Sequence, residues 1–544
     1  MSRHKLFLFL VIFLSTALRL FQLGTVPRGI TNDEAGIIYS AYSIAKTHTD
    51  ILGNFLPLSF HIDNSFSPTY IYITAPFVNI LSISPFSGRL PFAIMGIVSV
   101  FLLYLIVEKI FNNKSIALLS ATVLSISPWH IQITRAAYDA PVAMFFFLLG
   151  IYIFITKSSK GNISWSLPFF FLGFFSYHAT KVLFIPLILL LVFFHKDVLI
   201  KRKKELLFFS LGIIFILVSF AYITQTQNVT RQGVFLGSAS DLKNATSMVN
   251  WERERNTAPF FLREIYSNKP LYYLRVIREN YLESFSPHFL FLYGEVGGLS
   301  GIYGTLFRGT MYIIELPLLF LGFAFLLKRK EKRASYLLLS LLLIAPLPSA
   351  FTFDKSYVMR NSMMLPILAV ITGCGIYYFF QLLKRSKRIL FVSIASIFFL
   401  LYGFLVTEYL YQYYFRYSIY GAESWFTSNR DLATYIQKNK SKYQNITVIT
   451  KGNMFLLQYS VYNKTDPKII QSIWDKQGSK QIENILFTDG CIDTHDEVFT
   501  PEKYLKNSTL YIVPDECHKN SSPSDTIKEL GEPLRTIWKI YTNE

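Results

Sequence analysis

The chain has 544 residues, of which 52% are hydrophobic, 17% aromatic and only 16% charged, and its mean hydropathy is +0.35. An ordinary soluble protein is about 25% charged, so this composition excludes an ordinary soluble protein. It predicts a polytopic α-helical membrane protein surrounded by membrane lipids. Much of the formal net charge of +18 lies in short loops between apolar stretches, a pattern typical of cytoplasmic loops, which excludes nucleic acid as a partner.

The first apolar stretch, Leu6 to Leu23, follows a basic start at Arg3 and Lys5. It is longer than a typical signal-peptide core and no small-residue cleavage motif follows it, so we interpret it as a retained span. Similar stretches predict about eleven transmembrane helices in all. The predicted spans are residues 6–23, 88–107, 116–134, 140–156, 163–178, 182–194, 206–224, 311–327, 334–350, 362–383 and 389–408.

Three basic loops test this count. Residues 196–204, 328–333 and 384–388 fall on the same side as the N-terminus, which we therefore expect to be cytoplasmic. This agreement requires that the apolar stretch 70–83 does not cross the membrane. Because that stretch is short and contains Pro76, we expect it to lie in the interface or at the membrane edge.

The predicted topology places residues 24–87 and 225–310 outside, as two large loops of a transmembrane domain that covers residues 1–408. Residues 409–544 alternate short β-type runs with polar helical stretches, which predicts a small soluble extracytoplasmic α/β domain. Cys491 and Cys517 in this domain could form a disulfide if it faces an oxidising compartment. The third cysteine, Cys374, lies in an apolar span, and no zinc-type cluster exists.

The most informative site is the acid pair Asp33-Glu34, just after the first span. Two readings are open from the local sequence. Asn32 could cap a helix whose positive end favours both acids, or one acid could act as a general base or orient an acceptor.

A second group begins at Ser127-Pro128-Trp129-His130 and continues to Arg135 and Asp139, around a predicted external turn. Ionisable groups at membrane depth are costly and usually mark function. Arg135 and Asp139 could serve a substrate, or they could pair with each other and stabilise the turn.

Two further external corners carry basic residues. His178 and Lys181 lie at one corner, where Lys181 could bind a phosphate or simply extend to the interface. Arg360 enters a span at the other, where it could bind a phosphate or pair with Asp354. All four corners lie on the predicted external side, which indicates an enzyme whose substrate has a phosphate at the outer membrane surface.

The order of these motifs resembles the dolichyl-phosphate-mannose–protein mannosyltransferase superfamily, in its bacterial branch, which includes the aminoarabinose transferases of lipid A. The resemblance rests on Arg19-Leu20, Asp33-Glu34, Arg89-Leu90-Pro91 and the segment from Ser127 to Asp139. It is good over residues 6–200 and looser to residue 408. It implies a fold of the GT-C type and an inverting transfer of a sugar from a polyprenyl-phosphate carrier on the non-cytoplasmic face.

The resemblance also assigns roles. Asp33 matches the catalytic acid and Glu34 its companion, while Asp139 matches a second acid and Lys181 the lysine of a Thr-Lys pair. The aminoarabinose transferases carry a Lys-Pro pair that contacts phosphate where this chain has Ser67-Pro68, and an arginine where it has Gly36. Phosphate binding is therefore expected to depend on Lys181, Arg360 or Arg135.

The resulting hypothesis is a glycosyltransferase that needs neither metal nor other cofactor, with His130 and His178 among the groups that contact substrate. The acceptor is a protein, a lipid or a cell-envelope glycan. Two alternatives from other classes are a lipid-linked glycan flippase and a non-catalytic polyprenyl-phosphate-binding protein. Transporters often show repeated halves with polar residues at the bilayer midplane, whereas this chain has no visible repeat and gathers its ionisable residues at the external ends.

Overall fold

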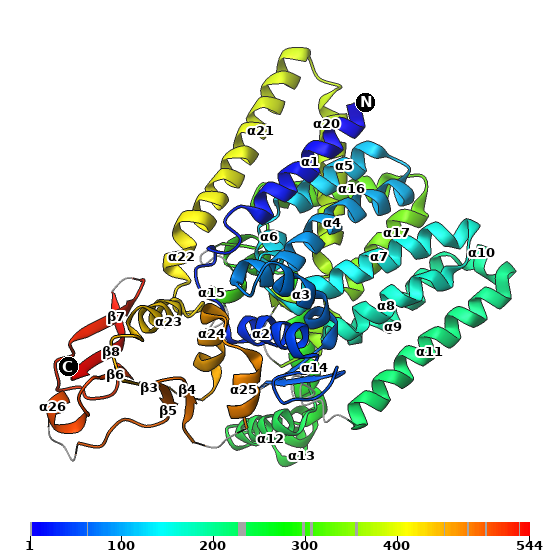
Figure 1. Cartoon of the computed structure of the whole chain (residues 1–544). Coiled ribbons are helices and arrows are strands. Elements are labelled where there is room, and N and C mark those ends of the chain that lie inside the picture. The colour runs from blue at the N-terminus through cyan, green and yellow to red at the C-terminus, as the bar shows by residue number, and fades with distance from the viewer. Residues whose placement is uncertain are drawn as a thin grey trace.

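The computed structural model is a helical bundle with a C-terminal sheet at one end (Figure 1). The residues that it describes are 3–62, 64–226, 235–295, 300–304, 308–353, 357–450, 452–475, 478–494, 498–531 and 534–543. A helix lies at each position where the sequence predicts a span. These helices are α1 (Arg3–Leu20), α4 (Pro85–Phe111), α5 (Lys114–Ile126), α6 (Pro128–Thr134), α7 (Asp139–Lys160), α8 (Leu167–Ser176), α9 (Thr180–Phe194), α11 (Lys203–Thr226), α16 (Glu315–Lys328), α17 (Lys332–Ile344), α20 (Met364–Leu383) and α21 (Arg388–Tyr411).

The predicted count of about eleven spans is not confirmed. Within the described residues, six helices are long and apolar enough to cross a membrane, or seven if α5 and α6, bent by 59° at Ser127, form one span. The other predicted spans are shorter or more charged. For example, α8 has 10 residues, α9 has 15 and α16 has 14, against roughly 20 for a full crossing. The chain is a multi-pass membrane protein, with six or seven such helices in its described part.

The basic loops lie at one end of the bundle, together with the N-terminus. Figure 1 shows the N-terminus beside the connection from α20 to α21, and Arg333 donates from Nε to the carbonyl of Phe194 at 2.7 Å. The C-terminal sheet lies at the opposite end. This arrangement is the one that the predicted topology requires, although the side of the membrane remains a prediction.

The two segments predicted to be external form short helices and a hairpin. After the first span come α2 (Asn32–Thr47), the hairpin β1–β2 (Phe60–Ile62, Asn64–Phe66) and α3 (Pro68–Ile80), so the stretch predicted at the membrane edge is a helix of 13 residues. The second loop forms α12 (Ala239–Glu254), α13 (Phe260–Tyr266), α14 (Lys269–Glu283), the π-helix η4 (His288–Leu292) and α15 (Ser300–Tyr303). Two short helices, α18 (Leu347–Ala350) and α19 (Tyr357–Arg360), precede α20.

The tail contains a six-stranded mixed sheet of order β4-β5-β3-β6-β8-β7. The central strand β3 (Asn445–Ile449) is parallel to both of its neighbours, β5 and β6. A disulfide joins Cys491 to Cys517, which resolves the alternative left open by their spacing. The remaining elements are the π-helix η6 (Gln412–Arg416), α22 (Tyr417–Tyr420), α23 (Thr427–Asn439), α24 (Met454–Asn463), α25 (Pro467–Ile473), α26 (Pro501–Tyr504), β4 (Lys480–Ile482), β5 (Ile485–Thr488), β6 (Thr509–Pro514), β7 (Asp525–Glu529) and β8 (Arg535–Asn543).

The tail packs directly on the first external loop. One hydrophobic core joins residues of α2 and α3, such as Ile38 and Tyr70, to tail residues such as Leu456. The Gln471 amide donates to the hydroxyls of Ser43, Thr47 and Thr49 and to the carbonyl of Asp50 at 2.8 to 3.1 Å. The tail therefore fixes the position of α2.

Candidate functional site

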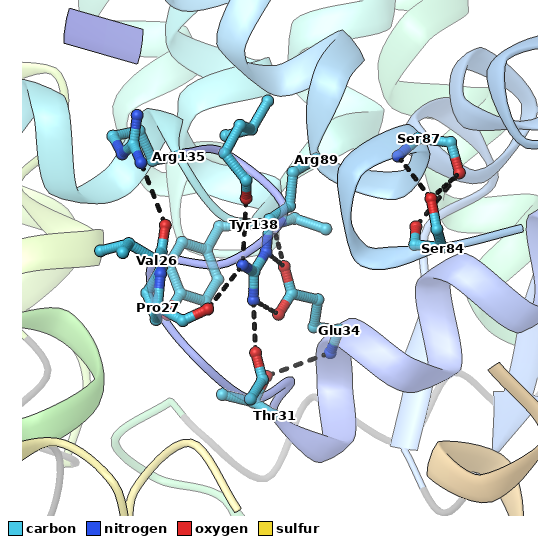
Figure 2. A network of polar contacts seen from close by, with 12 residues as sticks. Val26, Pro27, Thr31, Glu34, Ser84, Ser87, Arg89, Arg135 and Tyr138 are labelled. Carbon is cyan, nitrogen blue, oxygen red and sulfur yellow. Dashed lines mark hydrogen bonds and ion pairs between the residues drawn. The ribbon is translucent and has the colours of Figure 1, made fainter. Parts of the chain in front are cut away.

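The acid pair divides into two environments at the start of α2. Glu34 is fully buried and forms a bidentate ion pair with Arg89 of α4, with Nε–Oε1 at 2.7 Å and Nη2–Oε2 at 2.8 Å (Figure 2). The Arg89 guanidinium also donates to the carbonyls of Leu23, Pro27 and Gly29. A buried charge is tolerated only when it is paired and hydrogen-bonded. This network satisfies both charges and holds α4 against the loop before α2.

Asp33 is only partly buried and lies in the first turn of α2. The helix begins at Thr31, whose hydroxyl caps it by accepting from the Glu34 amide at 3.1 Å. The N-terminal end of a helix favours a negative charge there. Thr31, rather than the expected Asn32, is the capping residue.

The Glu34 carboxylate also brings a second helix start to this place. Its Oε1 accepts from the amide of Ala137 at 3.1 Å, two residues before Asp139, the first residue of α7. Two predicted acids, Asp33 and Asp139, therefore lie at the starts of two helices that meet at Glu34. Asp139, like Asp33, is partly exposed.

Arg135 and His130 are completely buried, beyond the Glu34–Arg89 ion pair. The Arg135 guanidinium donates to the carbonyls of Leu18, Arg19 and Val26 at 2.9 to 3.1 Å and to the Tyr413 hydroxyl at 3.2 Å. Each of its three nitrogens thus has a partner inside the protein, so a phosphate would have to displace one of these bonds.

His130 is held by the end of the first helix. Its Nδ1 lies 2.6 Å from Nη2 of Arg19. The other terminal nitrogen of Arg19, Nη1, donates to the Ser125 carbonyl at 3.1 Å. Ser127 accepts from the His130 amide at 3.3 Å and starts α6. The corner predicted from Ser127 to His130 is therefore a buried bend that joins α1 to α6.

Lys181 and His178 lie together at the corner between α8 and α9. Lys181 Nζ is 3.2 Å from His178 Nδ1 and 4.4 Å from the centroid of the Phe220 ring. The two residues line a small pocket of about 30 Å³ together with Phe66 and Ser67. Ser67 lies on the wall of this pocket. It occupies the position at which the sequence resemblance implies a lysine in the aminoarabinose transferases.

A large apolar groove begins beside this pocket. Its volume is about 780 Å³, and it runs between α3, α8 and α11, with wall residues such as Tyr72, Phe171 and Val218. Both spaces share four wall residues: Leu58, Pro68, Phe175 and Ile223. Only 17% of the apolar window in the helical stretch Lys196–Gln225, which contains most of α11, is buried in the protein, so this helix faces lipid and the groove lies at the membrane-facing flank. Apolar walls that end at a cation suit a ligand with a long hydrocarbon chain and an anionic head.

The pocket is connected to the start of α2 through the hairpin. A Cβ added to Gly36, one turn after Asp33, would lie 3.4 Å from the Phe66 ring and 3.5 Å from Ile62. Phe66 in turn lines the pocket of Lys181. The hairpin residue Phe66 therefore lies between the start of α2 and the pocket of Lys181.

Arg360 is buried at the end of α19, in the fourth predicted corner. Its neighbour Val358 accepts a hydrogen bond from the indole of Trp129 at 2.9 Å, which links this corner to the one around His130. Asp354, the predicted alternative partner of Arg360, lies outside the described residues. Among the residues with a described position, no three His, Cys, Asp or Glu side chains are grouped so as to hold a metal ion.

Sequence reasoning missed two residues that build this site. Arg89 was noted only as part of a motif, although a lone arginine in an apolar span needs a partner and could have signalled one. Gln458 of α24 is fully buried and donates to the carbonyl of Ile30 and to Asn32 Oδ1 at 3.1 and 3.0 Å. Nothing in the local sequence marks Gln458, because both acceptors of its amide nitrogen lie more than 400 positions earlier in the chain.

Residues 65–223 match the family model described as dolichyl-phosphate-mannose-protein mannosyltransferase. The resemblance expected from the sequence is thereby confirmed for this part of the chain, which includes Arg89, Asp139 and Lys181 but not Asp33 or Arg360. No curated protein matches the chain.

Solved structures provide more distant likenesses. The chain is similar to the archaeal oligosaccharyltransferase AglB from Archaeoglobus fulgidus, in complex with an inhibitory peptide and a dolichol-phosphate, with 14% identity and a TM-score of 0.47 over 85% of this chain. It spans only 64% of the length of that protein. It is also similar to ArnT from Cupriavidus metallidurans bound to undecaprenyl phosphate, with 10% identity and a TM-score of 0.49 over 98% of this chain and 97% of the other.

Proposed function

From the family match and the site geometry, we propose that this protein is an inverting glycosyltransferase that uses a polyprenyl-phosphate-linked sugar. It transfers the sugar to a protein, lipid or cell-envelope glycan on the non-cytoplasmic face. The observation that carries this proposal is the apolar groove of about 780 Å³ whose end adjoins the pocket of Lys181 and His178. A polyprenyl chain fits such walls because each buried methylene contributes about 0.8 kcal/mol.

In the proposed reaction, Asp33 accepts the proton of an acceptor hydroxyl or amine. The freed lone pair attacks the anomeric carbon from the face opposite the phosphate, and the bond between that carbon and the phosphate oxygen breaks. The electron pair leaves with the polyprenyl phosphate. A positioned general base of this kind contributes typically about 10²- to 10⁴-fold in rate.

The ammonium of Lys181 stabilises the negative charge that develops on the leaving phosphate, with His178 beside it at 3.2 Å. Arg360 adds positive charge at the neighbouring corner, and Asp139 orients the acceptor from the start of α7. Glu34, Arg135 and His130 contribute by holding the helix ends in place, because their side chains are buried and bonded within the protein.

The proposal is tested with membranes that contain the wild-type chain or Asp33→Asn, incubated with a panel of radiolabelled polyprenyl-phosphate sugars. We expect transfer from at least one donor with wild type and a loss of about 10²-fold or more with the variant. Undiminished turnover in Asp33→Asn would remove Asp33 from the mechanism. Binding of polyprenyl phosphate without transfer from any donor would favour a flippase or a binding protein instead.

A further inference from the structure

A second cavity, of about 380 Å³, lies at the external end of α21. One wall comes from the π-helix η4, through Phe291 and Leu292, and another from the π-helix η6, through Gln412 and Arg416. These are the two π-helices in the described part of the chain, and they flank the same space. Because π-helical turns are rare and occur frequently at functional sites, their pairing here indicates a built cavity.

Two arginines and one glutamate, Arg308, Arg416 and Glu408, line part of this cavity. Arg308 forms an ion pair with Glu408 and stacks on the rings of Tyr312 and Tyr409, at 5.0 and 5.4 Å from their centroids. These contacts fix the orientation of the guanidinium. Arg416 adds a second guanidinium that rests on Tyr420, 4.7 Å from the ring centroid. Two guanidinium groups against one carboxylate leave a net positive lining, which suits an anion with several acceptor oxygens.

Another part of the wall is apolar and borders the lipid. Met311, Ile313 and Leu405 line it, and only 11% of the apolar window in the helical stretch Arg388–Tyr420, which contains α21, is buried in the protein. Tyr411, the last residue of α21, is 55% exposed, and Tyr420, a wall residue of the cavity, is 43% exposed. Exposed aromatic side chains at the end of a span mark the depth of the lipid head groups. The cavity therefore opens where a head group and the first part of its chains would lie.

We infer that this cavity binds the phosphate head group of an anionic membrane lipid. Arg416 and Arg308 contact the phosphate oxygens, Gln412 donates to the same group, and the acyl chains follow the wall formed by Ile313 and Leu405. The cavity shares no wall residue with the groove or with the pocket of Lys181. The inference is therefore independent of the proposed transferase reaction.

The test measures binding of radiolabelled palmitoyl-oleoyl phosphatidylglycerol to the full chain in a neutral detergent. We expect saturable binding to wild type, weakened about tenfold by Arg416→Gln because a charge-assisted hydrogen bond is lost. Ile313→Trp, which fills the apolar side without changing charge, should weaken it as well. Arg255→Gln is the control, because Arg255 is an exposed external arginine stacked on Trp251 outside the cavity.

Unchanged unfolding temperatures would show that the variants are folded. Equal affinity of wild type, Arg416→Gln and Ile313→Trp would overturn the inference. A competition experiment provides a second test. Phosphatidylcholine with the same acyl chains should compete poorly with the labelled lipid. Inorganic phosphate at millimolar concentration should not displace it. Complete displacement by inorganic phosphate alone would overturn a lipid as the source of the anion.

Discussion

Glu34 accepts hydrogen bonds from both Nε and Nη2 of Arg89, and neither side chain reaches solvent. The pair joins the start of α2 to α4 (Figure 2). The adjacent Asp33 is partly exposed. Two neighbouring acids that look equivalent in the sequence are thus separated into a structural residue and a candidate catalytic residue.

The first prediction follows from this separation. Glu34→Gln leaves the Arg89 charge buried without a carboxylate, which costs about 3–5 kcal/mol for a buried pair. We expect a marked fall in the unfolding temperature of the detergent-solubilised protein. Asp33→Asn is the matched control, since a partly exposed substitution should change stability by no more than about 0.5 kcal/mol. Equal stability of the two variants would contradict the structural role of Glu34.

The apolar groove predicts a dependence on the length of the donor's hydrocarbon chain. Ser219 lines the groove on α11, and Ser219→Trp would fill part of it. Displacing only two methylenes, at about 0.8 kcal/mol each, raises KM for a long-chain donor on the order of tenfold. A donor with a very short chain should be affected much less.

The control for this experiment is Leu217→Trp, on the same helix but outside the groove, where Leu217 is 36% exposed. Kinetics with donors of increasing chain length measure the effect. A uniform rise of KM at all chain lengths in Ser219→Trp would place the hydrocarbon chain elsewhere.

From the hydrogen bonds of Gln458 we predict that the tail helps to position Asp33. Its amide nitrogen bonds Ile30 and Asn32, while its carbonyl oxygen accepts from Asn429 Nδ2 at 2.7 Å. Gln458→Ala should lower kcat several-fold to tenfold with little change in KM for the donor, because it loosens the segment that carries Asp33.

Gln471→Ala provides the comparison for Gln458, since Gln471 makes similar bonds at the opposite end of α2. Steady-state kinetics of both variants separate the two roles. If both variants lost stability alike and neither changed kcat, the tail would only support the loop.

The sequence allowed the helical bundle and the α/β tail to be predicted, because apolar length and local patterns decide them. The count of about eleven spans was not confirmed, since apolar runs such as α8 and α9 form helices of only 10 and 15 residues. The roles of individual residues could not be predicted in the same way. Arg135 was expected to be available for phosphate, yet its guanidinium already donates to carbonyls of the first helix and the loop after it. Glu34 pairs with a residue 55 positions away, and Gln471 bonds groups more than 420 positions away. Such contacts arise only when the bundle packs.

The disulfide gives a prediction about topology. Cys491 is exposed and joined to Cys517, and the remaining cysteine, Cys374, is buried. In Cys517→Ser, Cys491 becomes a thiol that a membrane-impermeant maleimide can label on intact cells if the tail is extracytoplasmic, as proposed. Wild type should stay unlabelled unless it is first reduced. Labelling of Cys517→Ser only after cell lysis would place the tail in the cytoplasm.

The measurement that tests the central claim most directly is the rate of polyprenyl phosphate release in a single turnover, with wild type and Asp33→Asn at saturating donor and acceptor. The account predicts that sugar transfer and release of the lipid phosphate fall together, by about 10²- to 10⁴-fold, while the protein keeps its unfolding temperature and its affinity for the donor. A folded Asp33→Asn protein that releases polyprenyl phosphate at the wild-type rate would contradict it.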